Sequence, residues 1–190
     1  AKVVPYEEET RRSLIIYDPR QANSGKQLRC DALTGNVDFA PTILALADLP
    51  VPKHMDGDSL LPLYVDPTVE IHQSLPLINV WGPPEAHSLS VVTKDWKYIY
   101  WPFAEGDFVA TEELYHTSSD PLELENCLQN PDTAATLGQL RDIFDKAVSS
   151  WKSDAVPYHN YRKYGTIFDR HLTWAQKSVV RRSLSPKPYD

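Results

Sequence analysis

Residues 88–101 read SLSVVTKDWKYIYW, and this stretch decides the fold of the second half of the chain. Two β-rich runs, 88–93 and 96–101, flank Lys94 and Asp95, a polar pair typical of a turn. The pattern therefore predicts a β-hairpin. Alternation puts bulky side chains on both faces of the second run, which favours a sheet packed on both sides over an exposed carbohydrate-binding stripe. One face carries Trp96, Tyr98 and Tyr100, and the other carries Lys97, Ile99 and Trp101.

A long amphipathic helix is predicted to cover this sheet. Residues 113–117 form a plausible third strand, and residues 77–81 another. Further on, Asn130 can cap a helix and Pro131 can open it, because the first helical amides have no intrahelical partner. Apolar residues then recur at spacings of three and four, at Leu137, Leu140, Phe144, Val148 and Trp151. A small antiparallel sheet with one helix is an α+β arrangement. The stretch from Val156 shows little periodicity, and its tail after Lys177 is expected to be either a wrapping arm or partly disordered.

The first third of the chain has a different pattern, with a short strand and then a helix. Residues 14–17, LIIY, are apolar on both faces and are closed by Asp18 and Pro19, which fits a strand buried in a layered sheet. Asp38 can cap the following helix. The apolar positions of that helix share one face and are Phe39, Ile43 and Leu46. A strand followed by a helix indicates the end of an α/β domain.

The composition is that of an ordinary globular protein with an acidic balance. Of 190 residues, 42% are hydrophobic and 24% charged, and the formal net charge is -7. This charge argues against a nucleic-acid partner, although a local cationic pocket could still hold an anionic substrate. No apolar run reaches the roughly 20 residues that span a bilayer. Cys30 and Cys127 match no metal-ligand spacing, and either a disulfide or two free thiols fits them.

The order of short phrases along the chain carries the functional information. Lys2 precedes all of them, and they read YEEETR at 6–11, LIIYDPR at 14–20, NVDFAPTIL at 36–44, MDGDSLLPL at 55–63, TKDWKYI at 93–99, ELYH at 113–116 and DPLE at 120–123. In this order the phrases resemble the C-terminal part of a type I sulfatase, a member of the alkaline-phosphatase-like superfamily. The resemblance implies an α/β part followed by an α+β part. Residues 1–65 would be the end of the α/β/α catalytic domain, residues 66–151 an α+β subdomain with a small antiparallel sheet and one long helix, and residues 152–190 an extended tail.

The resemblance makes Lys2 the expected catalytic residue of this chain. Spacing alone would indicate a solvated lysine, but the family places a lysine four residues before a Tyr-Glu pair in contact with the sulfate. A fixed ammonium there would stabilise the charge that develops on the leaving oxygen. Tyr6, Glu7 and Arg11 are expected as supporting residues of the same phrase. The chain departs from the family directly after Arg11, where residues 12–13 replace a small hydrophobic residue and a proline, so the loop shape there is open.

Trp81 and His87 are the expected substrate contacts, because this subdomain often lines the pocket of carbohydrate sulfatases. The alternative for both is a structural contact at the seam between domains. Residues 56–58, Asp-Gly-Asp, lack the other ligands of a calcium loop and are expected to form a turn.

The nucleophile and metal ligands of a sulfatase are missing from the sequence. Neither Cys30 nor Cys127 lies in the motif that is converted to formylglycine, and the paired aspartates that hold calcium are absent. We therefore expect no metal ligand and no cofactor in this chain, and calcium and formylglycine in the full-length enzyme. The chain alone is expected to be inactive.

The resemblance implies a parent enzyme that hydrolyses sulfate esters, with sulfated carbohydrate as the expected substrate. Its expected partners are the remaining N-terminal catalytic part and a sulfated small molecule or glycan, without nucleic acid or membrane. Exposed sheet edges could also mediate oligomerisation. Members of the family suggest a periplasmic, secreted or lysosomal location. Two alternatives stay open, namely a phosphodiester or phosphonate hydrolase of the same superfamily, and a non-enzymatic module that binds a partner or glycan.

Overall fold

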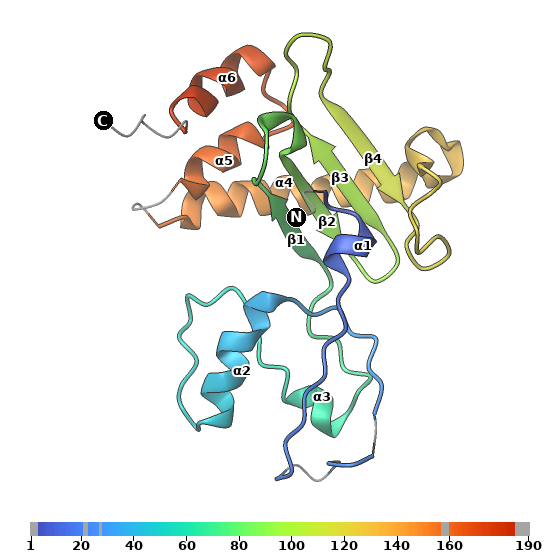
Figure 1. Cartoon of the computed structure of the whole chain (residues 1–190), viewed down its shortest axis with the longest axis vertical. Helices are drawn as coiled ribbons and strands as arrows, with labels where there is room; N and C mark the ends of the chain where they lie inside the picture. The colour runs from blue at the N-terminus through green and yellow to red at the C-terminus, as the bar shows by residue number, and fades with distance from the viewer. Residues whose placement is uncertain (1–3, 21–22, 27, 157–159, 185–190) are drawn as a thin grey trace. The chain divides into compact units, whose positions relative to one another are not determined.

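The computed structural model describes residues 4–20, 23–26, 28–156 and 160–184. The chain forms two compact units. The sheet unit combines Ala1–Arg11 with Pro76–Asp190, and the loop-rich unit is Arg12–Leu75. Figure 1 shows the sheet and the long helix α4 within the first unit, and the short helices α2 and α3 within the second. The domain division at residues 65 and 151 stays a prediction.

Four strands form one sheet in the order β1-β2-β3-β4 (Figure 1). Their bounds are Leu75–Asn79 for β1, Ser88–Val92 for β2, Lys97–Trp101 for β3 and Thr111–Tyr115 for β4. The predicted hairpin is confirmed, because β2 and β3 are antiparallel and Val92 pairs with Lys97. The turn is closed by the Thr93 N–H, which donates to the Trp96 carbonyl at 2.8 Å. Strand β4 pairs antiparallel with β3, as predicted, and begins two residues earlier than expected.

Helix α4, Ala134–Asp154, supplies the core under one face of the sheet. The predicted apolar stripe is confirmed, since Leu137, Leu140, Phe144 and Val148 are all buried. Phe144 packs edge-on against Tyr98 and Tyr100, with ring centroids 5.3 and 5.8 Å apart. The helix is introduced by the 3₁₀ turn Pro131–Thr133, where the Asn130 side chain accepts the Asp132 N–H at 3.0 Å. Asn130 therefore caps this turn rather than α4 itself.

Two helices follow α4, where an extended tail was expected over residues 152–190. They are α5, Tyr161–Ile167, and α6, Trp174–Arg182. Helix α5 packs closely on α4, because a Cβ at Gly165 would meet Lys152 Cγ at 2.7 Å. Helix α6 begins with a capping box in which the Thr173 hydroxyl accepts the Gln176 N–H. Local caps and close helix contact thus give order to a stretch whose apolar periodicity is weak.

The loop-rich unit is organised around the buried carboxylate of Asp38. Its regular elements are the 3₁₀ turn Asn36–Asp38, helix α2 at Phe39–Leu46 and helix α3 at Pro62–Val65. Asp38 accepts the N–H groups of Gly35 at 2.7 Å and of Asp58 at 2.9 Å, and its Oδ1 lies 2.7 Å from Nε2 of His72. Asp38 thus joins three distant parts of the unit instead of capping α2 with its side chain, as the sequence had suggested.

At residues 56–58, where a turn was predicted, the chain bends at Asp56 and Gly57, and Gly57 is needed there for packing. A Cβ at Gly57 would meet the Val37 carbonyl oxygen at 2.1 Å, which no side chain could tolerate. The close approach lets the Asp58 N–H reach Asp38.

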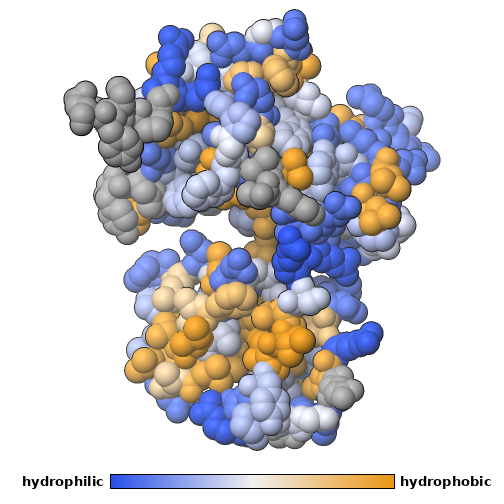
Figure 2. Space-filling view, viewed as in Figure 1, coloured by the Kyte–Doolittle hydropathy of each residue, from blue (hydrophilic) through white to orange (hydrophobic). Residues whose placement is uncertain are grey.

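Two local predictions in this unit are wrong. Residues 14–17 form no strand, and Ile15 and Tyr17 are 90% and 73% exposed. A strand needs a neighbour with which to share its backbone hydrogen bonds, and no described residue provides one. On α2, Ile43 is 64% exposed, whereas Thr42 is buried and its hydroxyl accepts the Leu60 N–H at 2.9 Å. This bond turns Thr42 inward and the apolar face outward. Figure 2 shows apolar residues gathered on the visible surface of the unit.

Candidate functional site

The phrase that follows Lys2 is held against the face of the sheet opposite α4. Tyr6 leads into the single-turn helix α1, Glu7–Thr10, and the Thr10 hydroxyl donates back to the Tyr6 carbonyl at 3.1 Å. The Tyr6 hydroxyl donates to Glu113 Oε2 of β4 at 3.1 Å, and its ring packs edge-on against Tyr115. Burial and the Glu113 carboxylate raise the pKa of Tyr6 to about 12, so this phenol stays a hydrogen-bond donor at neutral pH.

Lys97 of β3 is the centre of this arrangement. Its side chain is fully buried, and its Nζ lies 2.6 Å from Glu7 Oε1 and 2.9 Å from Glu123 Oε1. The same nitrogen donates to the Pro5 carbonyl at 3.0 Å and to the Thr10 hydroxyl at 3.3 Å. An ammonium group without such partners would be too costly to bury. The two carboxylates, the Pro5 carbonyl and the Thr10 hydroxyl therefore compensate for the loss of water around the buried Lys97 ammonium.

Glu123 connects this cluster to the start of α1. Its second oxygen, Oε2, accepts the Glu7 N–H at 2.6 Å. Its backbone has a φ of 54°, in the left-handed region, which costs a non-glycine residue roughly 1–2 kcal/mol. The surrounding structure holds this conformation, and in return the carboxylate reaches both Lys97 and Glu7. We call Lys97, Glu7 and Glu123 the buried triad.

The expected site residues occupy different environments. Lys2 lies outside the described residues. Glu7 is bound within the buried triad and Tyr6 to Glu113, whereas Arg11 is exposed, with its backbone N–H donating to the Glu7 carbonyl. Tyr6 and Glu7 therefore hold the segment through contacts with β3, β4 and Glu123, and Arg11 takes no part in these contacts. Their catalytic relevance stays a prediction.

The two expected substrate contacts differ in exposure. Trp81 is 78% exposed, so its ring is available for apolar contact with a ligand. His87 is half-buried and packs edge-on against Tyr164 of α5, with ring centroids 6.4 Å apart. Burial lowers the pKa of His87, which favours the neutral imidazole. Their role in substrate binding stays a prediction.

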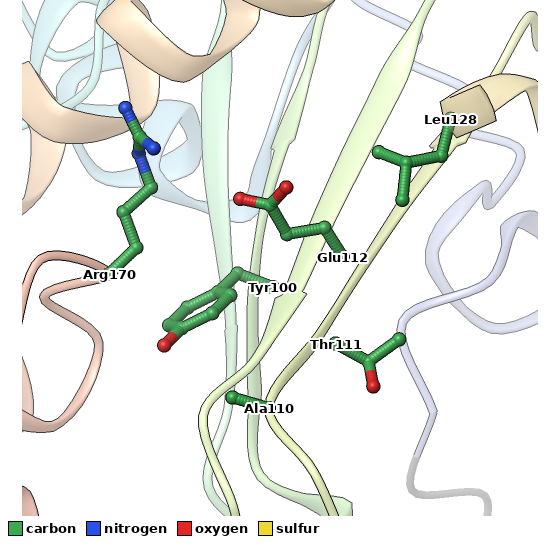
Figure 3. A pocket seen from close by; sticks show the side chains of 6 residues that line it. All are labelled: Tyr100, Ala110, Thr111, Glu112, Leu128 and Arg170. Atoms are coloured by element: carbon green, nitrogen blue, oxygen red, sulfur yellow. The ribbon is translucent and has the colours of Figure 1, made fainter. Parts of the chain in front are cut away.

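A pocket of about 420 Å³ lies on the helix-covered side of the sheet, and no sequence pattern predicted it. Figure 3 shows the side chains that line it, which are Tyr100, Ala110, Thr111, Glu112, Leu128 and Arg170. Its charged groups have partners within the protein. Glu112 accepts the Tyr98 hydroxyl at 2.7 Å and pairs with Arg141, while Arg170 forms two 2.8 Å bonds to Asp145. These charges stabilise the fold around the pocket.

A second buried lysine lies elsewhere in the sheet unit. Lys177 of α6 is 1% exposed, and its Nζ donates to the Tyr100 hydroxyl at 2.5 Å. Burial lowers the pKa of Lys177 to about 8, and the charge of Asp169 opposes this shift. Lys177 thus differs from Lys97, which has two carboxylates within 3 Å.

The described residues do not fit the calcium ion of a sulfatase. Among them, no cluster of three or more His, Cys, Asp or Glu side chains could bind a metal. Cys30 and Cys127 are both free thiols in the structure. Within the described ranges, no helix has the length and apolar character needed to cross a membrane.

Sequence patterns missed Lys97 and Glu123 as members of a site. Alternation correctly put Lys97 on the face opposite Tyr98, but lysines are usually exposed. The signal that could have found the triad is the combination of a lysine inside a strand with bulky neighbours on both sides. Such a lysine requires an acidic partner, and the phrases at 6–11 and 120–123 both carry one.

Solved structures show a sulfatase-like fold. The structure of BT4656 in complex with its substrate D-glucosamine-2-N,6-O-disulfate has a TM-score of 0.54 at 24% identity, covering 63% of this chain and 25% of that one. The structure of BT1596, a 2-O GAG sulfatase, has a TM-score of 0.52 at 26% identity, covering 66% and 25%. The arrangement of a four-stranded sheet and one long helix is thus that of a sulfatase C-terminal domain.

Residues 1–150 match the family model described as N-sulphoglucosamine sulphohydrolase, C-terminal. The chain belongs to this family. Arylsulfatase K of Xenopus laevis is 32% identical over 155 residues, which are 76% of this chain and 28% of the relative. Arylsulfatase K of Bos taurus is 29% identical over 185 residues, covering 92% and 31%. N-acetylglucosamine-6-O-sulfatase of Bacteroides thetaiotaomicron is 27% identical over 155 residues, covering 78% and 27%. The chain thus spans less than a third of these relatives.

Proposed function

We propose that this chain is the C-terminal part of a sulfatase that hydrolyses sulfate esters of carbohydrates. The observation that carries the proposal is the family match over residues 1–150, which begins with the segment containing Lys2. The relatives named above include an N-acetylglucosamine-6-O-sulfatase, which supports a sulfated sugar as substrate. The preceding catalytic part would supply the nucleophile, formylglycine, and the calcium ligands. The parent enzyme would be periplasmic, secreted or lysosomal.

Lys2 is the residue of this chain that we propose to contact the sulfate. Its ammonium would stabilise negative charge on the leaving oxygen as the sulfur–oxygen bond breaks. Anchoring of residues 5–10 on the sheet supports this role, because a fixed segment limits the positions that a lysine three residues earlier can reach.

The test is kinetic and uses the full-length parent enzyme. We expect Lys2→Ala to lower kcat/KM for a sulfated glucosamine by about 10²–10³-fold, as for the loss of one preorganised electrostatic contact. Lys94→Ala, at an exposed turn position, serves as the control and should leave kcat/KM unchanged. Faster turnover of a phosphodiester or phosphonate than of the sulfate ester would favour the alternative hydrolase. Calcium-dependent sulfate release by the 190-residue chain alone would contradict the proposal that the preceding catalytic part supplies the nucleophile and the calcium ligands.

Trp81 and His87 are proposed to contact the sugar of the same substrate. The exposed indole of Trp81 supports stacking, and the neutral His87 imidazole supports a hydrogen bond. His87→Ala should raise KM for the sulfated sugar without a comparable loss of kcat. A His87→Ala enzyme with unchanged KM and unchanged substrate selectivity would show that the ring only packs against Tyr164.

A further inference from the structure

We propose that Lys97 is a positioning residue of the parent enzyme, and that it holds residues 5–10 so that Lys2 reaches the sulfate. The inference rests on the proposed function of Lys2. Lys97 itself is fully buried, so it would act only through the segment that it binds.

The contacts of Lys97 converge on this segment from one nitrogen atom. Nζ meets the Pro5 carbonyl before α1, the Glu7 carboxylate in its first turn and the Thr10 hydroxyl at its end. Helix α1 has only four residues and would not persist without such contacts. Glu123 adds a further bond to the Glu7 N–H. One side chain of β3 thus fixes both ends of the turn that follows Lys2.

The energetics of the buried triad favour a geometric role. Removing two carboxylates and an ammonium from water costs about as much as their attraction returns, so an apolar trio of similar volume would stabilise the fold equally well. Polar contacts differ from apolar ones because a hydrogen bond defines where its partner lies. Lys97 Nζ donates to the Pro5 carbonyl and to the Thr10 hydroxyl, and Glu123 Oε2 accepts the Glu7 N–H. The left-handed backbone of Glu123 is a further cost, and with it the carboxylate reaches both Lys97 and the Glu7 N–H.

The segment length makes the anchoring relevant to Lys2. Lys2 lies three positions before Pro5 in the sequence. Because a chain spans at most about 3.6 Å per residue, anchoring of Pro5 limits the reach of Lys2 to roughly 11 Å between Cα atoms. A displacement of about 1 Å at a reacting centre can lower the rate by about 10²-fold. Loss of the bond from Lys97 to the Pro5 carbonyl should therefore lower kcat, although Lys97 would not contact the substrate.

The experiment removes the three charges together in the full-length parent enzyme. The variant Lys97→Met, Glu7→Gln, Glu123→Gln leaves no unpaired buried charge, so we expect it to fold. We expect kcat to fall roughly tenfold to a hundredfold with KM nearly unchanged. The decisive readout is a double-mutant cycle with Lys2→Ala. If the triad acts through Lys2, then Lys2→Ala should lower kcat much less in the triple variant than it does in the wild-type enzyme.

Lys177→Met is the matched control, because Lys177 is equally buried in the sheet unit but bonds to Tyr100. It should keep kcat and be additive with Lys2→Ala. Additive effects of the triad and Lys2, or wild-type kcat in the triple variant, would overturn the positioning role. Wild-type activity of Lys2→Ala alone would reject the proposed function of Lys2 and the positioning with it. Should the triple variant fail to fold, Glu123→Gln alone enters the same cycle, with the same decision.

Discussion

The sheet unit and the loop-rich unit of this chain bury different kinds of side chain. In the sheet unit, Tyr98, Leu114 and Phe144 are fully buried, and the core is continuous from the strands to α4. In the loop-rich unit, the fully buried groups include the charged Asp38, while Ile15 is 90% exposed and Val65 79% exposed. One unit therefore has a continuous apolar core of its own, whereas the other is held by polar contacts around the Asp38 carboxylate.

This contrast agrees with the proposed position of the chain within a larger enzyme. A contiguous apolar surface is typical of a part that packs against another part of the same protein. We therefore propose that the preceding catalytic part covers the exposed apolar residues of the loop-rich unit. The exposed side chains concerned include Leu14, Ile15, Ile16, Tyr17, Val37, Phe39, Ile43, Leu49 and Val65.

The most destabilising substitution should be one in the core of the sheet unit. Phe144→Ala should lower the free energy of unfolding by about 3–5 kcal/mol, because it leaves a cavity between Tyr98 and Tyr100. All five tryptophans belong to the sheet unit, so their fluorescence in a denaturant titration follows this unit. Ile43→Ala, at a 64% exposed position of the loop-rich unit, should change the stability by less than about 0.5 kcal/mol. Equal losses of unfolding free energy in Phe144→Ala and Ile43→Ala would contradict the contrast between an apolar core in the sheet unit and an exposed apolar surface in the loop-rich unit.

The second prediction concerns the polar centre of the loop-rich unit. Asp38→Ala should destabilise this unit by about 2–3 kcal/mol, because it removes the buried carboxylate that accepts the N–H groups of Gly35 and Asp58. Hydrogen exchange of the Leu60 amide, which donates to Thr42, is the local readout. Asp58→Ala is the control, since this carboxylate is 72% exposed. Unchanged exchange at Leu60 in Asp38→Ala would mean that apolar packing holds the unit.

The elements that sequence patterns predicted are those whose stabilising contacts lie close together in the chain. The β2–β3 hairpin follows from alternation around a four-residue turn, and the buried stripe of α4 follows from spacings of three and four. Residues 14–17 have the composition of a strand, but strand formation depends on a neighbour that the composition does not specify. Helix α6 was missed although its capping box, Thr173 with Gln176, is visible in the sequence.

The candidate site was less predictable because its residues come from distant segments. Pro5, Lys97 and Glu123 meet only after the sheet has formed, and Lys97 is separated from Pro5 by 92 positions. No local periodicity records such a contact. The family resemblance identified Glu7 as a supporting residue, and the structure adds the partner that holds it.

The third prediction concerns Lys177, whose Nζ bonds to the Tyr100 hydroxyl, whereas Lys97 has two carboxylate partners. The pKa of Lys177 is lowered to about 8, so between about pH 8 and 10.5 the unfolded chain binds more protons than the folded one. Stability should therefore rise with pH across this window. Relative to Lys177→Met, the wild type should gain up to ~2 kcal/mol between pH 7.5 and 9.5. Denaturant titrations at several pH values measure this difference. A constant difference would show that Lys177 is charged throughout.

The smallest expected effect on stability is at the apolar surface of the loop-rich unit. Ile15→Lys combined with Val65→Lys should change the free energy of unfolding by less than about 0.5 kcal/mol, because both positions are exposed. The same pair should clearly reduce the binding of an apolar fluorescent dye and the self-association of the 190-residue chain in sedimentation experiments.

Val109→Lys with Leu124→Lys provides the matched pair, because these residues of the sheet unit are 74% and 81% exposed. Isolated exposed apolar residues are common on soluble proteins and contribute little to association. If only the Ile15 and Val65 pair reduces dye binding and self-association, the self-associating surface lies in the loop-rich unit, where we propose that the catalytic part packs. Equal reductions by both pairs would show that self-association is a general property of the surface. The proposal that a partner covers the loop-rich unit would then lose its support.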